Sequence, residues 1–105
     1  MSTDAIVAET IRQRLADVFD VRRVVLFGSR ARGDARSDSD YDVLVVANTD
    51  IPFVERQGRA LQAIGPRDYS LDLLVYTPRE AREAQEIVGS AVYWAEREGQ
   101  VVYAR

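Results

Sequence analysis

Residues 24–46 read VVLFGSRARGDARSDSDYDVLVV, in which a polar loop separates two apolar runs. The runs at 24–27 and 43–46 are each typical of a buried strand. Asp40 and Asp42 stand two positions apart at the start of the second strand, and because strand side chains alternate between faces, we expect both to point the same way. Two adjacent carboxylates repel each other unless a cation lies between them, and hard oxygen ligands suit Mg²⁺ or Mn²⁺. The pair therefore predicts a divalent metal site.

The loop between the two runs has the features of a phosphate site. Gly28 directly follows the first strand, where a residue without a side chain lets a ligand approach the backbone. Ser29 is expected to cap a short helical turn whose N–H groups attract phosphate. Arg30 and Arg32 add positive charge suited to a polyphosphate. A phosphate cradle facing two metal-binding carboxylates is the equipment of metal-assisted nucleotidyl transfer.

The amino-acid composition excludes several other classes of site. The 105 residues, 47% hydrophobic and 30% charged, suit one small globular domain over residues 1–105. The sequence has no Cys and no His, which excludes thiol nucleophiles, a Ser-His-Asp triad and metal held by either residue. All 14 basic residues are Arg, so a Walker A loop with its Lys is also excluded.

The net charge and the hydropathy of the chain limit which partners and which cellular location we expect. The net charge of −3 argues against non-specific binding of nucleic acid, and no direct nucleic-acid binding is expected. No apolar run approaches membrane-spanning length, and the N-terminus has no signal-peptide pattern. We therefore expect no membrane association and a cytoplasmic location.

Hydrophobic periodicity and turn residues predict the remaining elements. Helices are expected over residues 3–18, 52–64, 78–85 and 91–98, strands over 21–27, 41–46 and 69–76, a short edge strand at 100–103 and a loop at 47–50. The expected buried residues are Val7, Ile11, Leu15 and Val18 in the first helix and Phe53, Leu61 and Ile64 in the second. The order helix, strand, strand, helix, strand, helices indicates an α/β fold with a small mixed β-sheet packed with helices.

The last two helices carry clear boundary signals. Thr77 is the expected cap of the third long helix, Ser90 caps the last one, and Gly99 ends it. Tyr93 and Trp94 lie on the last helix, and such aromatic residues lie more often in a core than at an interface.

Asp72 lies between two leucines inside the third predicted strand. A carboxylate within a core strand is costly and requires an explanation. In one interpretation the strand is at an edge of the sheet and Asp72 faces water. In the other, which we favour, Asp72 joins Asp40 and Asp42 from a neighbouring strand.

The acidic loop also has simpler interpretations. Asp34 and Asp38 are well explained as solvated charges, whereas Asp42, next to a buried run, is not. A calcium loop of the EF-hand type starting at Asp38 is rejected because Val43 stands where Gly is needed. Arg36 is best explained as a surface charge.

The pair Gly28-Ser29, followed after ten residues by Asp40-Tyr41-Asp42, resembles the signature of the DNA polymerase β-like nucleotidyltransferase superfamily. The longer stretch GSRARGDARSDSDYD is similar to its minimal nucleotidyltransferase branch, and the resemblance covers nearly the whole chain. It implies the polymerase β-like nucleotidyltransferase fold.

The resemblance also implies a role for each matching residue. The catalytic, metal-holding carboxylates would be Asp40, Asp42 and Asp72, with Mg²⁺ or Mn²⁺ as the metal. The nucleotide-binding residues would be Gly28, Ser29 and Arg30, which hold the phosphates of a nucleoside triphosphate.

Minimal nucleotidyltransferases of this kind are commonly partnered with a helical HEPN-domain toxin. The resemblance therefore implies an antitoxin that transfers AMP from ATP to a hydroxyl, a tyrosine of the toxin. Two alternatives stay open: a non-catalytic antitoxin that neutralises its partner by binding, and a nucleotidyltransferase acting on a small molecule. Relatives of the last kind carry an additional acceptor domain, and we expect nothing in these 105 residues to serve as one.

Overall fold

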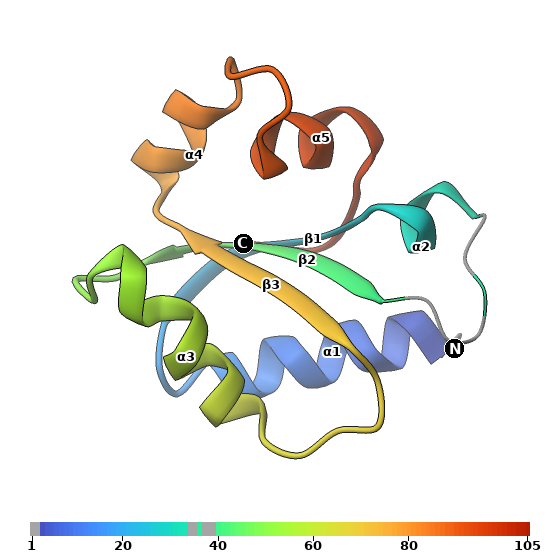
Figure 1. Cartoon of the computed structure of the whole chain (residues 1–105). Helices are drawn as coiled ribbons and strands as arrows, with labels where there is room; N and C mark the ends of the chain where they lie inside the picture. Colours follow the sequence, from blue (N-terminus) through green and yellow to red (C-terminus); the bar gives the residue numbers. More distant parts are fainter. Residues whose placement is uncertain (1–2, 34–35, 37–39) are drawn as a thin grey trace.

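A four-stranded mixed β-sheet organises the chain in the computed structural model, which describes residues 3–33, 36 and 40–105 (Figure 1). The strands are β1 (Asp20–Phe27), β2 (Tyr41–Asn48), β3 (Leu71–Tyr76) and β4 (Gln100–Ala104), in the order β3-β2-β1-β4. Strand β1 pairs antiparallel with β2 and β4, whereas β2 and β3 run parallel. The expected α/β fold with a small mixed sheet is confirmed.

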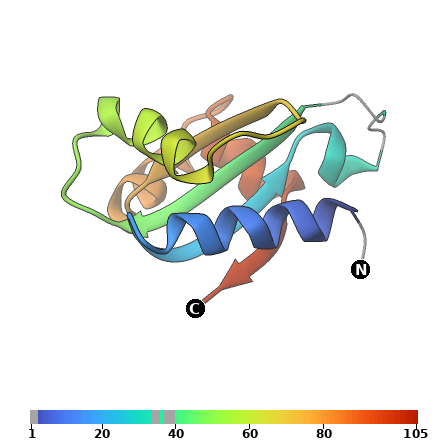
Figure 2. The same cartoon turned by 90° about the horizontal axis from the view of Figure 1, so that it is seen from below.

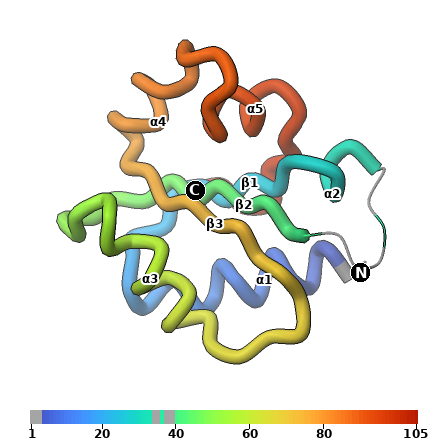
Figure 3. Tube along the Cα trace, in the orientation of Figure 1, coloured from blue at the N-terminus to red at the C-terminus, as the bar shows by residue number. Residues whose placement is uncertain are grey.

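Helices cover both faces of this sheet. The helices α1 (Thr3–Leu15) and α3 (Phe53–Ile64) lie on one face, and α4 (Pro78–Ala84) and α5 (Ala91–Glu98) lie on the other (Figures 1 and 2). The short helix α2 (Ser29–Arg32) stands at one end of the sheet, where β1 ends and β2 and β3 begin (Figure 3). None of the helices in the described part of the chain is long and apolar enough to cross a membrane.

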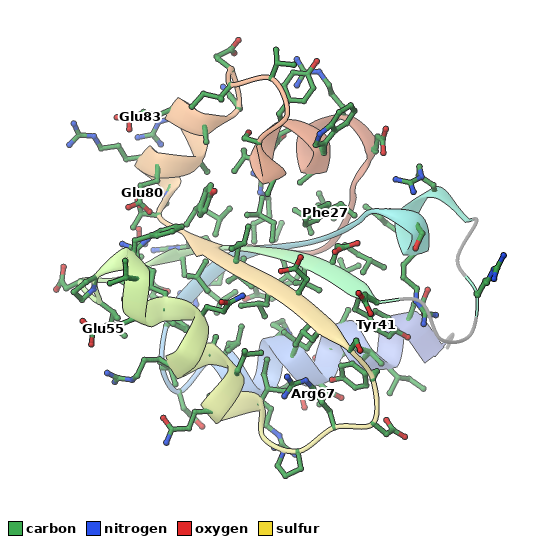
Figure 4. The ribbon with its side chains drawn as sticks, viewed as in Figure 1. Phe27, Tyr41, Glu55, Arg67, Glu80 and Glu83 are labelled. Carbon is green, nitrogen blue, oxygen red and sulfur yellow. The ribbon has the colours of Figure 1, made fainter. Side chains whose placement is uncertain are left out.

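Alternating side chains along the strands fill a separate apolar core on each face. Toward α1 and α3 the buried residues include Ile11, Leu15, Val24, Val43, Val45, Leu73 and Val75, and toward α4 and α5 they are Val25, Leu44, Val46, Ala81, Val92 and Ala95. Phe27 packs against the second core and Tyr41 belongs to the first (Figure 4). Because residues two apart share a face, Asp42 lies on the α4–α5 side of β2, in line with Leu44.

The predicted caps of the last two helices are confirmed. The Thr77 hydroxyl accepts from the Glu80 N–H at 3.2 Å, and the Glu80 carboxylate accepts from the Thr77 N–H at 2.8 Å. The Ser90 hydroxyl accepts from the Tyr93 N–H at 3.0 Å, and α5 ends before Gly99. The edge strand after Gly99 is also present, as β4. These boundaries are set by contacts within a few residues, which is why the sequence predicts them well.

Some predicted boundaries were wrong. Helix α1 ends at Leu15 rather than at residue 18, and β3 begins at Leu71 rather than at residue 69. Ala47, assigned to a loop, continues β2 because it pairs with Val21 of β1 and is buried. The residues that follow Ala47 are typical of a turn, and the sequence does not show that Ala47 pairs with Val21.

The buried faces of the long helices were predicted in part. In α1, Ile11 and Leu15 are fully buried, and Val7 and Val18 pack partly against the core. In α3, Ile64 is buried and Leu61 is partly buried, but Phe53 is 47% exposed, contrary to the prediction.

Arg56 takes a buried position in α3 that the sequence did not suggest. Its guanidinium donates to the carbonyl oxygens of Ile51 at 2.8 Å and Val75 at 3.3 Å, and to the Glu80 carboxylate at 2.5 Å. These bonds satisfy the buried charge and tie α3 to the ends of β3 and α4.

Candidate active site

The carboxylates of Asp42 and Asp72 come together through strand register. Strands β2 and β3 are parallel and in step, so that Asp42 stands directly beside Asp72. Neighbouring strands are about 4.8 Å apart, and residues in register point to the same face. The prediction that Asp72 stands on a strand next to the Asp40/Asp42 stretch is therefore confirmed at the level of the backbone.

The environment of Asp72 corrects one part of the sequence argument. Strand β3 is an edge strand and Asp72 is exposed, so this carboxylate does not carry the burial cost that a core strand would impose. The two interpretations of Asp72 are thus not exclusive, because the residue faces water and also stands beside Asp42. Sequence alone does not reveal that β3 lies at an edge.

Gly28 forms a tight turn against Asp42. It follows Phe27, the partner of Asp42 in the β1–β2 ladder, and has φ 71° and ψ −153°, a conformation almost restricted to glycine. A Cβ atom at Gly28 would overlap the Oδ2 atom of Asp42 and lie 3.1 Å from its Cγ. The missing side chain therefore leaves the space in which the Asp42 carboxylate lies against the backbone.

Ser29 was wrongly assigned as the cap of α2. Gly28 is the N-cap, and its carbonyl oxygen accepts from the N–H groups of Ala31 and Arg32, each at 3.1 Å. Ser29 is the first residue of the helix. The turn begins one residue earlier than expected because Gly28 alone adopts the required backbone angles. Phosphate binding by Gly28 and Ser29 stays a prediction.

Arg30 contacts the N-terminal helix. Its guanidinium lies 3.3 Å from the Asp4 carboxylate and 4.2 Å from the centre of the Tyr41 ring, and its side chain is 12% exposed. The Tyr41 hydroxyl donates to the same Asp4 carboxylate at 2.8 Å. These contacts join α2 to α1 and β2 on the α1 side of the sheet, and the assignment of Arg30 to a phosphate stays a prediction.

The pKa of the Asp42 carboxyl reflects both its partial burial and the charges at this end of the sheet. Partial burial raises the pKa of the Asp42 carboxyl above its ordinary value, and the nearby charges of Asp72 and Asp40 raise that pKa further. Arg32 acts in the opposite direction on the same pKa. Asp40 itself is exposed, just before β2. Three carboxylates and one guanidinium thus share one local field.

The carboxylates of Asp40, Asp42 and Asp72 have the ligand chemistry that a hard divalent cation requires. Carboxylate oxygens are the donors that Mg²⁺ and Mn²⁺ prefer, and a cation would relieve the repulsion that raises the pKa of Asp42. Within residues 3–33, 36 and 40–105, however, no three such side chains lie close enough together to hold a metal ion. The metal set of Asp40, Asp42 and Asp72 stays a prediction.

Three further charged residues lie in the acidic loop. Asp34 and Asp38, interpreted as solvated charges, lie outside the described residues. Arg36 is exposed, as expected of a surface charge.

A pocket beside Gly28 was not predicted from the sequence. It has a volume of about 270 Å³ and is lined by Phe27, Gly28, Arg32, Trp94 and Glu98. Trp94, an aromatic residue of the type found more often in a core, is instead 44% exposed. Trp94, on the last predicted helix, is the lining residue whose sequence position gave no indication that it lies beside Gly28.

Comparison with known proteins supports the resemblance found in the sequence. Residues 8–68 match the family described as the nucleotidyltransferase domain. The protein adenylyltransferase MntA of Thermococcus cleftensis is 31% identical over 86 residues, which cover 78% of this chain and 83% of that protein. A Methanocaldococcus jannaschii protein, provisionally named a protein adenylyltransferase, is 44% identical over 34 residues, and the match spans only 32% of this chain and 34% of that relative.

Solved structures share the fold at lower sequence identity. A structure from Sulfolobus solfataricus, provisionally named a nucleotidyltransferase, superimposes with a TM-score of 0.64 at 19% identity, over 100% of this chain and 91% of that one. A toxin–antitoxin structure with AMP-PNP gives a TM-score of 0.58 at 22% identity, over 93% of this chain and 73% of that one. The matched domain, the similar relative and the shared fold together show that the chain belongs to the nucleotidyltransferase domain family.

Proposed function

We propose that this protein is a Mg²⁺-dependent adenylyltransferase that moves AMP from ATP to a tyrosine hydroxyl of a HEPN-type toxin, and so acts as its antitoxin. The observation that carries the proposal is the meeting of Asp42 and Asp72 in register, next to the glycine turn at Gly28. The name of the Thermococcus cleftensis relative, a protein adenylyltransferase, supports a protein as acceptor.

In this reaction the bond between the α-phosphorus of ATP and its bridging oxygen breaks, and pyrophosphate leaves. A new bond forms between that phosphorus and the acceptor oxygen, whose proton must be removed. Bound Mg²⁺ would neutralise the charge that develops on the triphosphate. Asp40 and Asp42 would hold that ion. Asp72, exposed beside Asp42, would help to hold a second ion or accept the proton.

The glycine turn would serve the triphosphate. Gly28 leaves the backbone uncovered at the point nearest the Asp42 carboxylate, and Ser29 opens the following helix. Arg30 would steady the phosphates according to the family pattern. Its contacts with Asp4 and Tyr41, on the α1 side of the sheet, give it a second role, which is to hold α2 in place.

Calorimetry tests the nucleotide-binding half of the proposal. ATP is expected to bind in the presence of Mg²⁺ or Mn²⁺ and to lose affinity in EDTA, because the carboxylates near Asp42 repel a triphosphate that carries no metal ion. Equal affinity with and without metal would count against the site.

Label transfer separates the proposed enzyme from an antitoxin that acts by contact alone. With α-labelled ATP, Mg²⁺ and a HEPN-type toxin that the protein neutralises, label should move to the toxin and should be lost with Asp72→Ala. A binding-only antitoxin would still neutralise its partner as the Asp72→Ala variant, and no label would move.

A further inference from the structure

The pocket beside Gly28 is built from three separate elements. Phe27 and Gly28 come from the end of β1, Arg32 comes from α2, and Trp94 and Glu98 come from α5. Figure 4 shows Phe27 on the α5 side of the sheet, between β1 and that helix. Its volume of about 270 Å³ lies just below the range of about 300–1,000 Å³ for ligand pockets, so that it suits one ring system and not a whole nucleotide.

Gly28 joins this pocket to the candidate active site. The residue lines the pocket, and its Cα also lies against the carboxylate of Asp42. A ligand that extends from the carboxylates of Asp42 and Asp72 across the glycine turn would therefore reach the pocket. Arg32 connects the two regions as well, because it lines the pocket and acts electrostatically on Asp42.

The walls of the pocket have the chemistry of a site for a flat aromatic ring. Trp94 is 44% exposed, and its ring meets that of Tyr93 edge to face, with centroids 5.2 Å apart, which helps to hold it in place. Phe27 supplies a second aromatic wall. At the rim, Arg32 and Glu98 form an ion pair at 3.3 Å, which offers both a donor and an acceptor to polar ring edges. Aromatic side chains bind nucleobases by stacking on their faces.

We propose, on the basis of the function proposed above, that this pocket holds the base of the donor nucleotide, with its ring against Trp94. The triphosphate then extends past Gly28 toward Asp42 and Asp72. Because a purine offers a larger face for stacking than a pyrimidine, purine nucleotides bind more tightly than pyrimidine nucleotides.

Trp94 is the only tryptophan of the chain, so that intrinsic fluorescence reports directly on the pocket. The experiment is a titration of the protein with ATP and, separately, with tripolyphosphate, both with Mg²⁺, followed by fluorescence and by calorimetry. ATP should change the emission of Trp94, and tripolyphosphate, which has no base, should bind with little change in emission.

Substitutions at Trp94 make the test quantitative. Trp94→Ala should weaken ATP binding roughly tenfold, within the range for one base stacked on one aromatic ring, and Trp94→Phe should weaken it less. Neither variant should alter the affinity for tripolyphosphate. Val54→Ala, at an 88% exposed position of α3 on the opposite face of the sheet, is the matched control and should change nothing.

The outcomes separate this inference from the proposed function. If ATP binds with Mg²⁺ but Trp94→Ala leaves its affinity unchanged, or ATP leaves the emission unchanged, the base lies elsewhere and only this inference is overturned. If neither ATP nor tripolyphosphate binds the wild-type protein, the proposed function fails and the inference fails with it.

Discussion

Replacing Gly28 by alanine tests whether the missing side chain at this position makes room for the Asp42 carboxylate. Gly28 has φ 71° and ψ −153°, and holding a residue with a side chain in that region costs about 1–3 kcal/mol. The new Cβ would also overlap Oδ2 of Asp42 and lie 3.3 Å from its Cβ, so the Asp42 side chain must move. Such overpacking typically costs about 1–3 kcal/mol more. We therefore expect Gly28→Ala to lower the free energy of unfolding by about 2–6 kcal/mol.

Gly33→Ala is the matched control for backbone strain. Gly33 ends α2 with φ 82° and ψ 9°, and no described atom lies within 4 Å of the position that a Cβ would take. Its substitution should cost about 1–2 kcal/mol, for the left-handed backbone alone. A loss at Gly28 that exceeds the loss at Gly33 therefore reports the contact with Asp42 together with the less favourable ψ angle of Gly28.

Urea denaturation of a double-mutant cycle supplies the decisive comparison. Asp42→Ala removes the overlapping atoms, so that the combination with Gly28→Ala should lose less stability than the sum of the single variants, by about 0.5–3 kcal/mol. Strict additivity, or equal losses for Gly28→Ala and Gly33→Ala, would refute the claim that Gly28 makes room for the carboxylate.

Three further substitutions have expected outcomes that denaturation at several pH values can check. Asp42→Asn without metal should raise the free energy of unfolding at neutral pH, because the native pKa of Asp42 lies above its ordinary 3.8 and ionisation of this carboxyl opposes folding. The gain in the free energy of unfolding should shrink as the pH falls through the raised pKa and vanish below 3.8. A loss of stability at neutral pH would contradict this prediction. Arg56→Met should cost about 2–3 kcal/mol through its lost hydrogen bonds. Because the Arg56 guanidinium lowers the pKa of Glu80, the wild type should lose the stability that this ion pair contributes as the pH falls below 4.5 through the lowered pKa. If the free energy of unfolding of the variant falls with acid as steeply as that of the wild type, the ion pair between Arg56 and Glu80 does not contribute. Gly58→Ala, inside α3 with open space around the new Cβ, should stabilise by about 0.5–1 kcal/mol, and a loss would mean that α3 is strained there.

The parts of the fold that sequence predicted well depend on nearby residues. The caps at Thr77 and Ser90 involve hydrogen bonds to the third residue beyond, and the strands around Phe27 and Asp42 follow from continuous apolar runs. The α/β class follows from the order of those elements.

The features that sequence missed depend on residues far apart in the chain. Arg56 is buried because Glu80 and backbone carbonyls from other segments satisfy its charge, and no local pattern encodes those partners. Ala47 belongs to β2 because β1 pairs with it.

The candidate site shows the same division. The motif around Gly28 and Asp42 is local and was identified from the sequence. The assignment of the helix cap to Ser29 was wrong by one residue, because the sequence does not determine the backbone angles at Gly28. The exposure of Asp72 depends on strand order, and the pocket that Trp94 lines depends on the packing of α5 over the end of β1.

The intact mass of the partner tests the proposed function most directly. A HEPN-type toxin that the protein neutralises is incubated with ATP, Mg²⁺ and either the wild type, Asp42→Asn or the control Glu83→Gln, whose side chain is exposed on α4. The proposal predicts that the wild type and Glu83→Gln add the mass of AMP to a tyrosine of the partner and that Asp42→Asn adds none. A partner of unchanged mass that is nevertheless neutralised by all three proteins would contradict the proposed transfer.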